Sequence, residues 1–175
     1  QDSYNFKGEY SPADYDRKQT LVQQICTELT VHTILEEEIF YPACKGQIEE
    51  DLLAEAYVEH DGAKVLIAEL LASAPDEEFY DAKVKVLSEQ IEHHVEEEER
   101  RSEGMFSQAR KAGLDMDALA DRMRARKEAL TAQFKAEGLP APETRTFTGH
   151  DMVEGDVVED DSAGRPATNE PRARA

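Results

Sequence analysis

Hydrophobic residues recur every three or four positions from about residue 20 to residue 134, and this spacing is typical of amphipathic helices. Ser11 followed by Pro12 resembles a helix cap with proline in the first turn, so a long first helix is expected to begin there. Its inward stripe is expected to consist of Leu21, Ile25, Leu29, His32, Glu36 and Ile39. Proline disrupts helical hydrogen bonding, and Pro42 is therefore expected to stop this helical pattern near Cys44 and Gly46.

Two more helices follow from the same spacing. The stripe of the second is Leu53, Ala56, His60, Ala63, Ile67 and Leu70, and that of the third is Tyr80, Val84, Leu87, Ile91, His94 and Glu98. Residues 73–76 (Ser-Ala-Pro-Asp) are expected to close the second helix and to cap the third. Gly104 indicates a break or bend after the third helix.

A fourth helix is expected from Asp115 to Gly138, with an apolar side made of Met116, Leu119, Met123, Leu130 and Phe134. Residues 1–137 are therefore assigned to one helical domain. Residues 138–175 are short of large aliphatic side chains and rich in Pro, Gly, Asp and Glu, which predicts a disordered acidic tail. The fold class is all-α, because no β-type alternation is sustained and the short connections imply antiparallel neighbours.

The chain carries 20 Lys and Arg against 39 Asp and Glu, a formal net charge of −19. This charge repels phosphate backbones and anionic lipids, so neither nucleic acid nor a membrane is expected as a partner. No apolar run approaches the roughly 20 residues of a membrane span, and no export signal is recognisable in the first residues. Cys26 and Cys44 form no CxxC motif and are expected to be free thiols in a reducing cytoplasm.

The polar residues on the inward stripes suggest the chemistry. His32 and Glu36 are four residues apart, and so are His94 and Glu98, so each pair projects an imidazole and a carboxylate from one helix face. His60 lies on the stripe of the helix between them. A buried carboxylate is destabilising unless it meets a positive charge, and no Lys or Arg shares these stripes. These five residues are therefore the predicted ligands of a buried metal site.

His93 and Glu97 form a rival pair with the same spacing. Their row along the helix is less apolar than that of His94 and Glu98, so they are expected to flank the site, behind the ligands or as alternative ligands. His150 lies in the predicted tail and is expected to be an ordinary surface histidine.

Imidazole and carboxylate donors without a thiolate suit iron, manganese or zinc and argue against copper(I) and iron–sulfur clusters. Two inward glutamates on different helices can bridge two cations, so a site with two ions is compatible with the sequence. A coordination position that the protein leaves open would be available to O2, peroxide, nitric oxide or water.

Three segments resemble the hemerythrin or HHE cation-binding family: residues 32–42 (HTILEEEIFYP), 55–71 (EAYVEHDGAKVLIAELL) and 92–99 (EHHVEEEE). The resemblance covers residues 15–137 and implies an up-and-down four-helix bundle that holds a non-haem iron centre, usually with two ions. By motif, it implies that His32, Glu36, His60, His94 and Glu98 are ligands, with the two glutamates bridging the ions.

Two features depart from the family pattern. The family carries a histidine on a helix ahead of the first HxxxE motif, whereas residues 1–31 contain none, and the chain does not begin with methionine. After the second HxxxE motif the family commonly has Phe-Pro, whereas residues 100–115 read RRSEGMFSQARKAGLD. We therefore expect a bundle whose first helix is missing and whose groove is covered by an upstream segment, with the helix from Asp115 or a second chain of a homo-oligomer as alternatives.

The leading hypothesis is a hemerythrin-like binding protein without turnover that binds or senses O2 or a related small oxidant, or holds iron. The alternative is a di-iron oxidase or peroxidase, which requires an open iron position, a substrate cavity and a proton donor nearby. A third hypothesis is a helical interaction protein whose inward histidines are ordinary core residues, but it leaves the inward glutamates without a partner.

Overall fold

The structure, a computed structural model, describes residues 11–147. Its helices are α1 (Pro12–Leu35), η1 (Glu36–Phe40, a π-helical turn), α2 (Tyr41–Cys44), α3 (Glu50–Ala72), α4 (Tyr80–Glu99), α5 (Met105–Lys111) and α6 (Met116–Glu137). No strand occurs within these residues, so the all-α prediction is confirmed. Over the same range, no helix is both long enough and apolar enough to cross a membrane.

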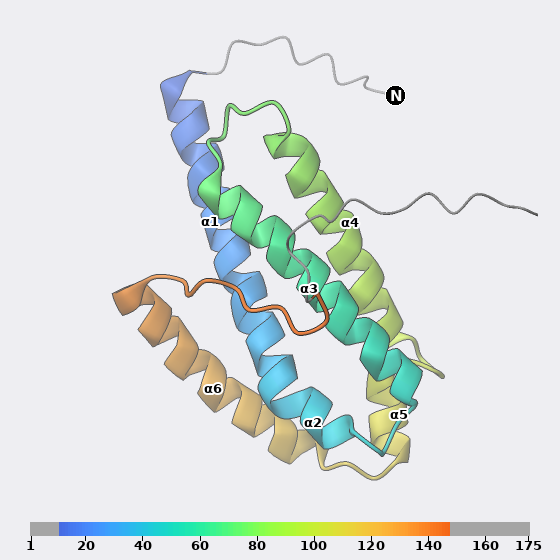
Figure 1. The fold of residues 1–175 in the computed structure, drawn as a ribbon. Coiled ribbons are helices and arrows are strands. Elements are labelled where there is room, and N and C mark those ends of the chain that lie inside the picture. Colours follow the sequence, from blue (N-terminus) through green and yellow to red (C-terminus); the bar gives the residue numbers. More distant parts are fainter. Residues whose placement is uncertain (1–10, 148–175) are drawn as a thin grey trace, which may run out of the picture.

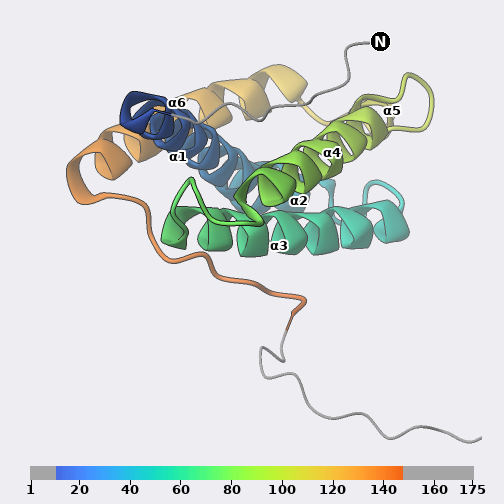
Figure 2. The same ribbon diagram turned by 90° about the horizontal axis from the view of Figure 1, so that it is seen from above.

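Helices α1, α3 and α4 are consecutive antiparallel neighbours, as Figure 1 shows. α3 packs against both α4 and α1, and α6 packs against α1 and η1 on the side away from α3 (Figure 2). Val31 and Leu35 of α1 meet Leu130 and Phe134 of α6 in one apolar cluster, so α6 covers the C-terminal half of α1. The up-and-down bundle of four helices with a missing first member stays a prediction.

Two further apolar clusters lie along the bundle, one on each side of the predicted ligands. The first consists of Val22, Cys26, Ala63, Ile67, Leu70, Tyr80 and Leu87. The second consists of Ile39, Phe40, Tyr41, Cys44, Leu53, Ala56, Met105, Ala109 and Leu119. On α3, His60 falls between residues of the two sets, and His94 and Glu98 lie between Leu87 of α4 and Met105 of α5. Apolar layers therefore enclose the polar side chains from both ends.

The helix ends were predicted with mixed success. Ser11 and Asp14 form a capping box at the start of α1, in which the Asp14 N–H donates to Ser11 Oγ over 3.3 Å. α6 begins directly after Asp115, as expected, and the Asp115 side chain caps it by accepting from the Ala118 N–H. The prediction that residues 73–76 cap the third helix is wrong, because α4 begins at Tyr80 without a side-chain cap.

The first helical stretch ends at Cys44, where the pattern was expected to stop, and Pro42 itself lies inside the stretch. The helical path continues from α1 through η1 into α2, and the Tyr41 N–H donates to the Glu36 carbonyl in the i to i+5 pattern of a π-helix. Proline has no N–H, and its ring collides with the carbonyl four residues earlier in an α-helix. The wider π turn accommodates Pro42 and places Tyr41 on the same face as Glu36.

Helix α1 turns a different row of side chains toward the core than predicted. Leu21 and Ile25 are 50% and 46% exposed, whereas Val22 and Cys26 are 6% and 0% exposed. The two rows have the same helical spacing, so periodicity could not distinguish them. Ile25 lines an apolar groove of about 230 Å³ between α1 and α4.

Gly104 fixes the chain after α4. A Cβ atom at this position would lie 2.6 Å from the backbone oxygen of Glu98 and equally close to backbone atoms of Arg100. Only glycine permits this approach, so the predicted break at Gly104 is confirmed. The tight turn holds the end of α4, which carries Glu98.

The first part of the predicted disordered tail is in contact with the helices. Leu139 packs on the cluster between α1 and α6, and the following residues run back over α1 and α3 (Figure 1). We call residues 139–147 the C-terminal strap. The rest of the predicted tail, including His150, lies outside the described residues.

The packing of α6 predicts a difference between two leucines. Leu130→Ala should lower the free energy of unfolding by about 2–5 kcal/mol, because it empties a position in the α1–α6 cluster. Leu21→Ala, at a half-exposed position of α1, should change it by less than about 1 kcal/mol. Denaturant unfolding of both variants measures the difference, and equal losses would contradict the placement of α6.

Candidate metal centre

Helix register brings the five predicted ligands to one level of the bundle. Four of them, His32, Glu36, His60 and His94, offer donor atoms that all lie within 4.8 Å of one another. Glu98 joins this group, since its Oε1 lies 3.5 Å from His94 Nε2. The residues come from α1, η1, α3 and α4, so the cluster ties together three separate passes of the chain.

The Glu36 carboxylate lies where the three imidazoles converge. Glu36 Oε2 is 3.2 Å from Nε2 of His32 and of His60, and 3.8 Å from Nε2 of His94. Glu36, His60, His94 and Glu98 are 1–3% exposed, whereas the His32 side chain is 36% exposed. Within residues 11–147, the ion pairs of Glu36 and Glu98 are made with histidines and none with Lys or Arg.

Tyr41 is a member of the cluster that the sequence reasoning missed. Its hydroxyl lies 3.0 Å from His60 Nε2, 3.4 Å from His94 Nε2, 3.0 Å from Glu98 Oε1 and 3.3 Å from Glu36 Oε2. The phenol oxygen therefore sits in the middle of the donor atoms. The sequence feature that could have indicated Tyr41 is Pro42. The π turn that accommodates Pro42 brings residue 41, five positions after Glu36, next to Glu36, where a regular α-helix would bring residue 40.

Outer carboxylates orient the two most buried imidazoles. His60 Nδ1 lies 3.1 Å from Glu37 Oε1, and His94 Nδ1 lies 2.7 Å from Glu59 Oε2. A carboxylate can only accept these hydrogen bonds, so each Nδ1 carries a proton and Nε2 is the ring nitrogen that faces the centre of the cluster. This arrangement is common behind metal-binding histidines, where it fixes the ring and makes the inner nitrogen more basic.

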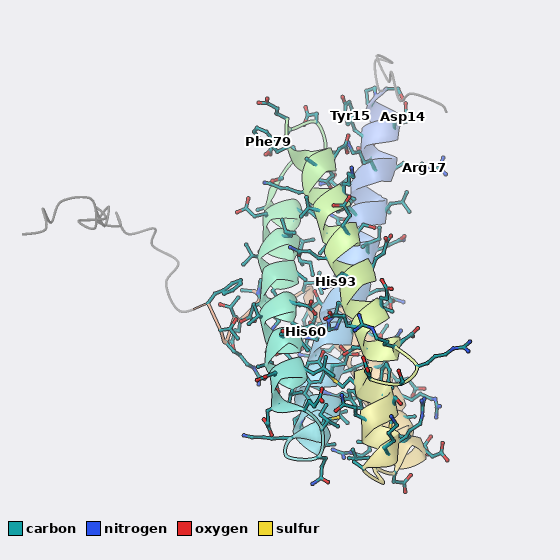
Figure 3. All side chains as sticks on the ribbon, turned by 90° about the vertical axis from the view of Figure 1, so that its right-hand side faces the viewer. Asp14, Tyr15, Arg17, His60, Phe79 and His93 are labelled. Carbon is teal, nitrogen blue, oxygen red and sulfur yellow. The ribbon has the colours of Figure 1, made fainter. Side chains whose placement is uncertain are left out.

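His93 and Glu97 lie outside the cluster. The side chain of His93 is 63% exposed, and its Nε2 is 3.5 Å from Glu97 and 3.6 Å from Glu59. Figure 3 shows His93 on α4 beside His60 on α3, midway along the bundle. His93, Glu97 and Glu59 form a separate group of possible metal-binding side chains. Among the described contacts, Glu59 joins this group to the buried cluster, because it also contacts His94. That His93 and Glu97 flank the metal ligands, or serve as alternative ligands, stays a prediction.

The cluster holds protons where a cation would supply positive charge. Burial and the nearby Glu36 carboxylate raise the pKa of Glu98 to about 7. Burial lowers the pKa of His94, but the hydrogen bond to Glu36 and the charge of Glu98 outweigh it and raise the pKa to about 9. Burial would raise the pKa of Glu36, but the imidazoles of His60 and His94 lower it to about 2.

The donor atoms fit a metal ion. His32 Nε2 is a buried atom without a hydrogen-bond partner of suitable geometry among the described residues, although it points at Glu36. An unpartnered buried nitrogen is unfavourable by itself and becomes satisfied as a ligand. Three imidazoles, two carboxylates and a phenol suit iron, manganese or zinc, as the sequence predicted.

Comparison with known proteins gives one finding. The family model described as the hemerythrin HHE cation-binding domain matches residues 5–106, more than half of the 175 residues. The match contains the whole cluster and ends within α5. No curated protein and no solved structure matches the chain significantly.

The raised pKa values predict how the metal-free protein responds to pH. Glu98 and His94 bind protons more tightly in the folded state than at their ordinary values of 4.5 and 6.5, so these two groups stabilise the fold more at pH 5 than at pH 9. This stabilisation is lost as the pH rises through about 7 and about 9. The thermal midpoint of chelator-treated protein should therefore fall between pH 5 and 9, and less steeply in Glu98→Gln. A midpoint that rises over this range would contradict the assignment.

Proposed function

The chain belongs to the hemerythrin HHE cation-binding family, and we propose that its cation is non-haem iron, bound as two ions by His32, Glu36, His60, His94 and Glu98. In this proposal Glu36 and Glu98 would be the carboxylates that hold both ions, because each carboxylate has two oxygens and both lie among the imidazoles. The observation that carries the proposal is the convergence of three imidazole Nε2 atoms on a buried carboxylate that has no Lys or Arg partner in the described part of the chain.

Tyr41 is proposed to complete the donor set. Its hydroxyl is within 3.4 Å of both inner imidazoles, so it can serve either as a ligand or as a hydrogen-bond donor to a small molecule at the site. Burial and the charges of Glu36 and Glu98 raise the pKa of Tyr41 far above its ordinary value, which keeps the phenol protonated in the metal-free protein. A cation beside the oxygen would reverse that preference.

We propose that the bound molecule is O2 or a related small oxidant or diatomic. The His32 edge of the cluster opens onto a groove of about 320 Å³ lined by α1, α4 and Lys127 of α6, which provides an approach from solvent. Iron supplies the redox chemistry for such a ligand. The protein holds the ring nitrogens in place, seals the opposite sides with apolar layers and keeps one hydroxyl at the centre.

A second candidate function, a di-iron oxidase or peroxidase, is favoured by one observation. Turnover of an oxidant requires a proton donor close to the site. The Tyr41 hydroxyl, 3.0 Å from both His60 and Glu98, meets that requirement. Peroxide consumption by the iron-loaded protein distinguishes turnover from reversible binding.

The first test is the metal content of histidine variants. His60→Ala and His94→Ala should each reduce iron affinity by about tenfold or more, because each removes a buried donor and leaves Glu36 short of a partner. His93→Ala is the matched control, since it removes an exposed imidazole from α4, the helix that carries His94. Elemental analysis and the optical spectrum give the metal and its amount. Equal iron in all three variants and the parent would refute the assignment.

Tyr41→Phe separates the two roles proposed for the hydroxyl. If the phenol oxygen binds ferric iron, the parent protein should show a visible phenolate-to-iron charge-transfer band that the variant lacks. If the phenol is only a donor, the spectrum should stay the same while release or turnover of the small ligand changes by about tenfold or more. A variant that matches the parent in both respects would remove Tyr41 from the proposal.

A further inference from the structure

The C-terminal strap is anchored by a buried acid. Asp61 on α3 is 1% exposed, and its Oδ2 accepts hydrogen bonds from the Arg145 N–H, the Thr146 N–H and Thr146 Oγ1 over 2.8, 2.6 and 2.7 Å. A carboxylate that accepts several hydrogen bonds binds its donors strongly. Without the strap, this buried oxygen would have none of these three partners.

Two cations link the strap to Glu37. Lys64 Nζ donates to the Glu143 carbonyl over 3.1 Å and lies 2.7 Å from Glu37 Oε1. Arg145 Nε lies 3.3 Å from Glu37 Oε2, and its guanidinium lies over the ring of Tyr57. Each oxygen of Glu37 therefore has a positive partner, and the strap supplies one of these partners and holds the other.

Glu37 in turn holds His60. Its Oε1 accepts from His60 Nδ1 over 3.1 Å, while His60 Nε2 faces Glu36 and Tyr41. Position and charge of the Glu37 carboxylate therefore determine the angle and basicity of the inner nitrogen.

We propose that the C-terminal strap is a positioning element for the metal ligand His60, acting through Asp61, Lys64 and Glu37. The inference rests on the proposed function, because it assigns the strap to the same cation site. When the strap is docked, Glu37 is fixed and the His60 ring faces the centre; when the strap lifts, Lys64 and Glu37 lose their strap partners and the ring is less constrained.

Thermodynamic linkage makes the proposal testable in both directions. If docking of the strap strengthens metal binding, bound metal must stabilise the docked strap by the same factor. The strap contains a natural reporter, because trypsin cleaves after Arg145 only when this segment leaves Asp61 and enters the protease.

The experiment uses the full chain with iron(II) added under anaerobic conditions, or with chelator. Iron should slow cleavage of the Arg145–Thr146 bond by about fivefold or more, measured by mass spectrometry with a peptide substrate in the same reaction to correct for trypsin activity. Asp61→Asn should remove this protection and weaken iron affinity by about fivefold. Thr146→Ala keeps the two backbone donors, so it should reduce the protection and the affinity in the same direction but by less. Glu37→Gln should weaken affinity by about tenfold or more.

Glu38→Gln is the matched control. Glu38 neighbours Glu37 but pairs with Arg126 of α6, so its variant should keep both the affinity and the iron-dependent protection. Thr146→Ala is a second variant that is not expected to misfold, because the Thr146 side chain lies on the exposed strap. Circular dichroism measures whether Asp61→Asn keeps the helix content of the parent. If the parent chain takes up iron normally but its rate of tryptic cleavage does not depend on iron, the positioning role of the strap is overturned. The same holds if Asp61→Asn binds iron with unchanged affinity. Both outcomes leave the proposed function intact. A parent chain that takes up no iron overturns the proposed function and this inference together.

Discussion

The burial of Glu36 and Glu98 is the constraint on which the rest of the structure depends. Two carboxylates a few ångströms from a shared phenol, in a core of helices, carry a large desolvation cost unless positive charge or protons reach them. The described part of the chain meets this cost with imidazoles and a hydroxyl instead of Lys or Arg. Such a set of groups is neutral only when it holds protons or a cation, which agrees with the cation binding that defines the family.

The π turn makes the cluster possible on a helix that contains proline. A regular α-helix through Pro42 would lose a hydrogen bond and would place the Tyr41 ring away from Glu36. The extra residue in η1 instead turns Glu36, Glu37 and the aromatic pair Phe40 and Tyr41 toward buried surroundings. The same distortion that accommodates the proline therefore supplies the hydroxyl at the centre of the site.

The sequence predicted what depends on regular helix spacing and missed what depends on departures from it. Helix type, the Gly104 break and the inward direction of His94 rather than His93 all follow from a period of 3.6. Leu21 and Ile25 were misplaced because the adjacent row of Val22 and Cys26 has the same period and tertiary packing chose it. The position of Tyr41 depends on the register shift of the π turn, which a regular period does not predict. The docking of the strap depends on hydrogen bonds between Asp61 and residues about 85 positions away, which no local pattern encodes.

Three consecutive glutamates follow His32 at close range, and each faces a different structure. Glu36 enters the histidine cluster, Glu37 meets Lys64 and the strap, and Glu38 binds Arg126 of α6 through both oxygens. The tripeptide is thus a junction that joins the histidine cluster, the strap and α6. A change of backbone geometry at one of the three glutamates also moves the other two. Anyone transplanting this centre into a designed helical scaffold would have to move the junction as a unit, with its wide turn, because deleting one residue there would rotate all three carboxylates away from their partners.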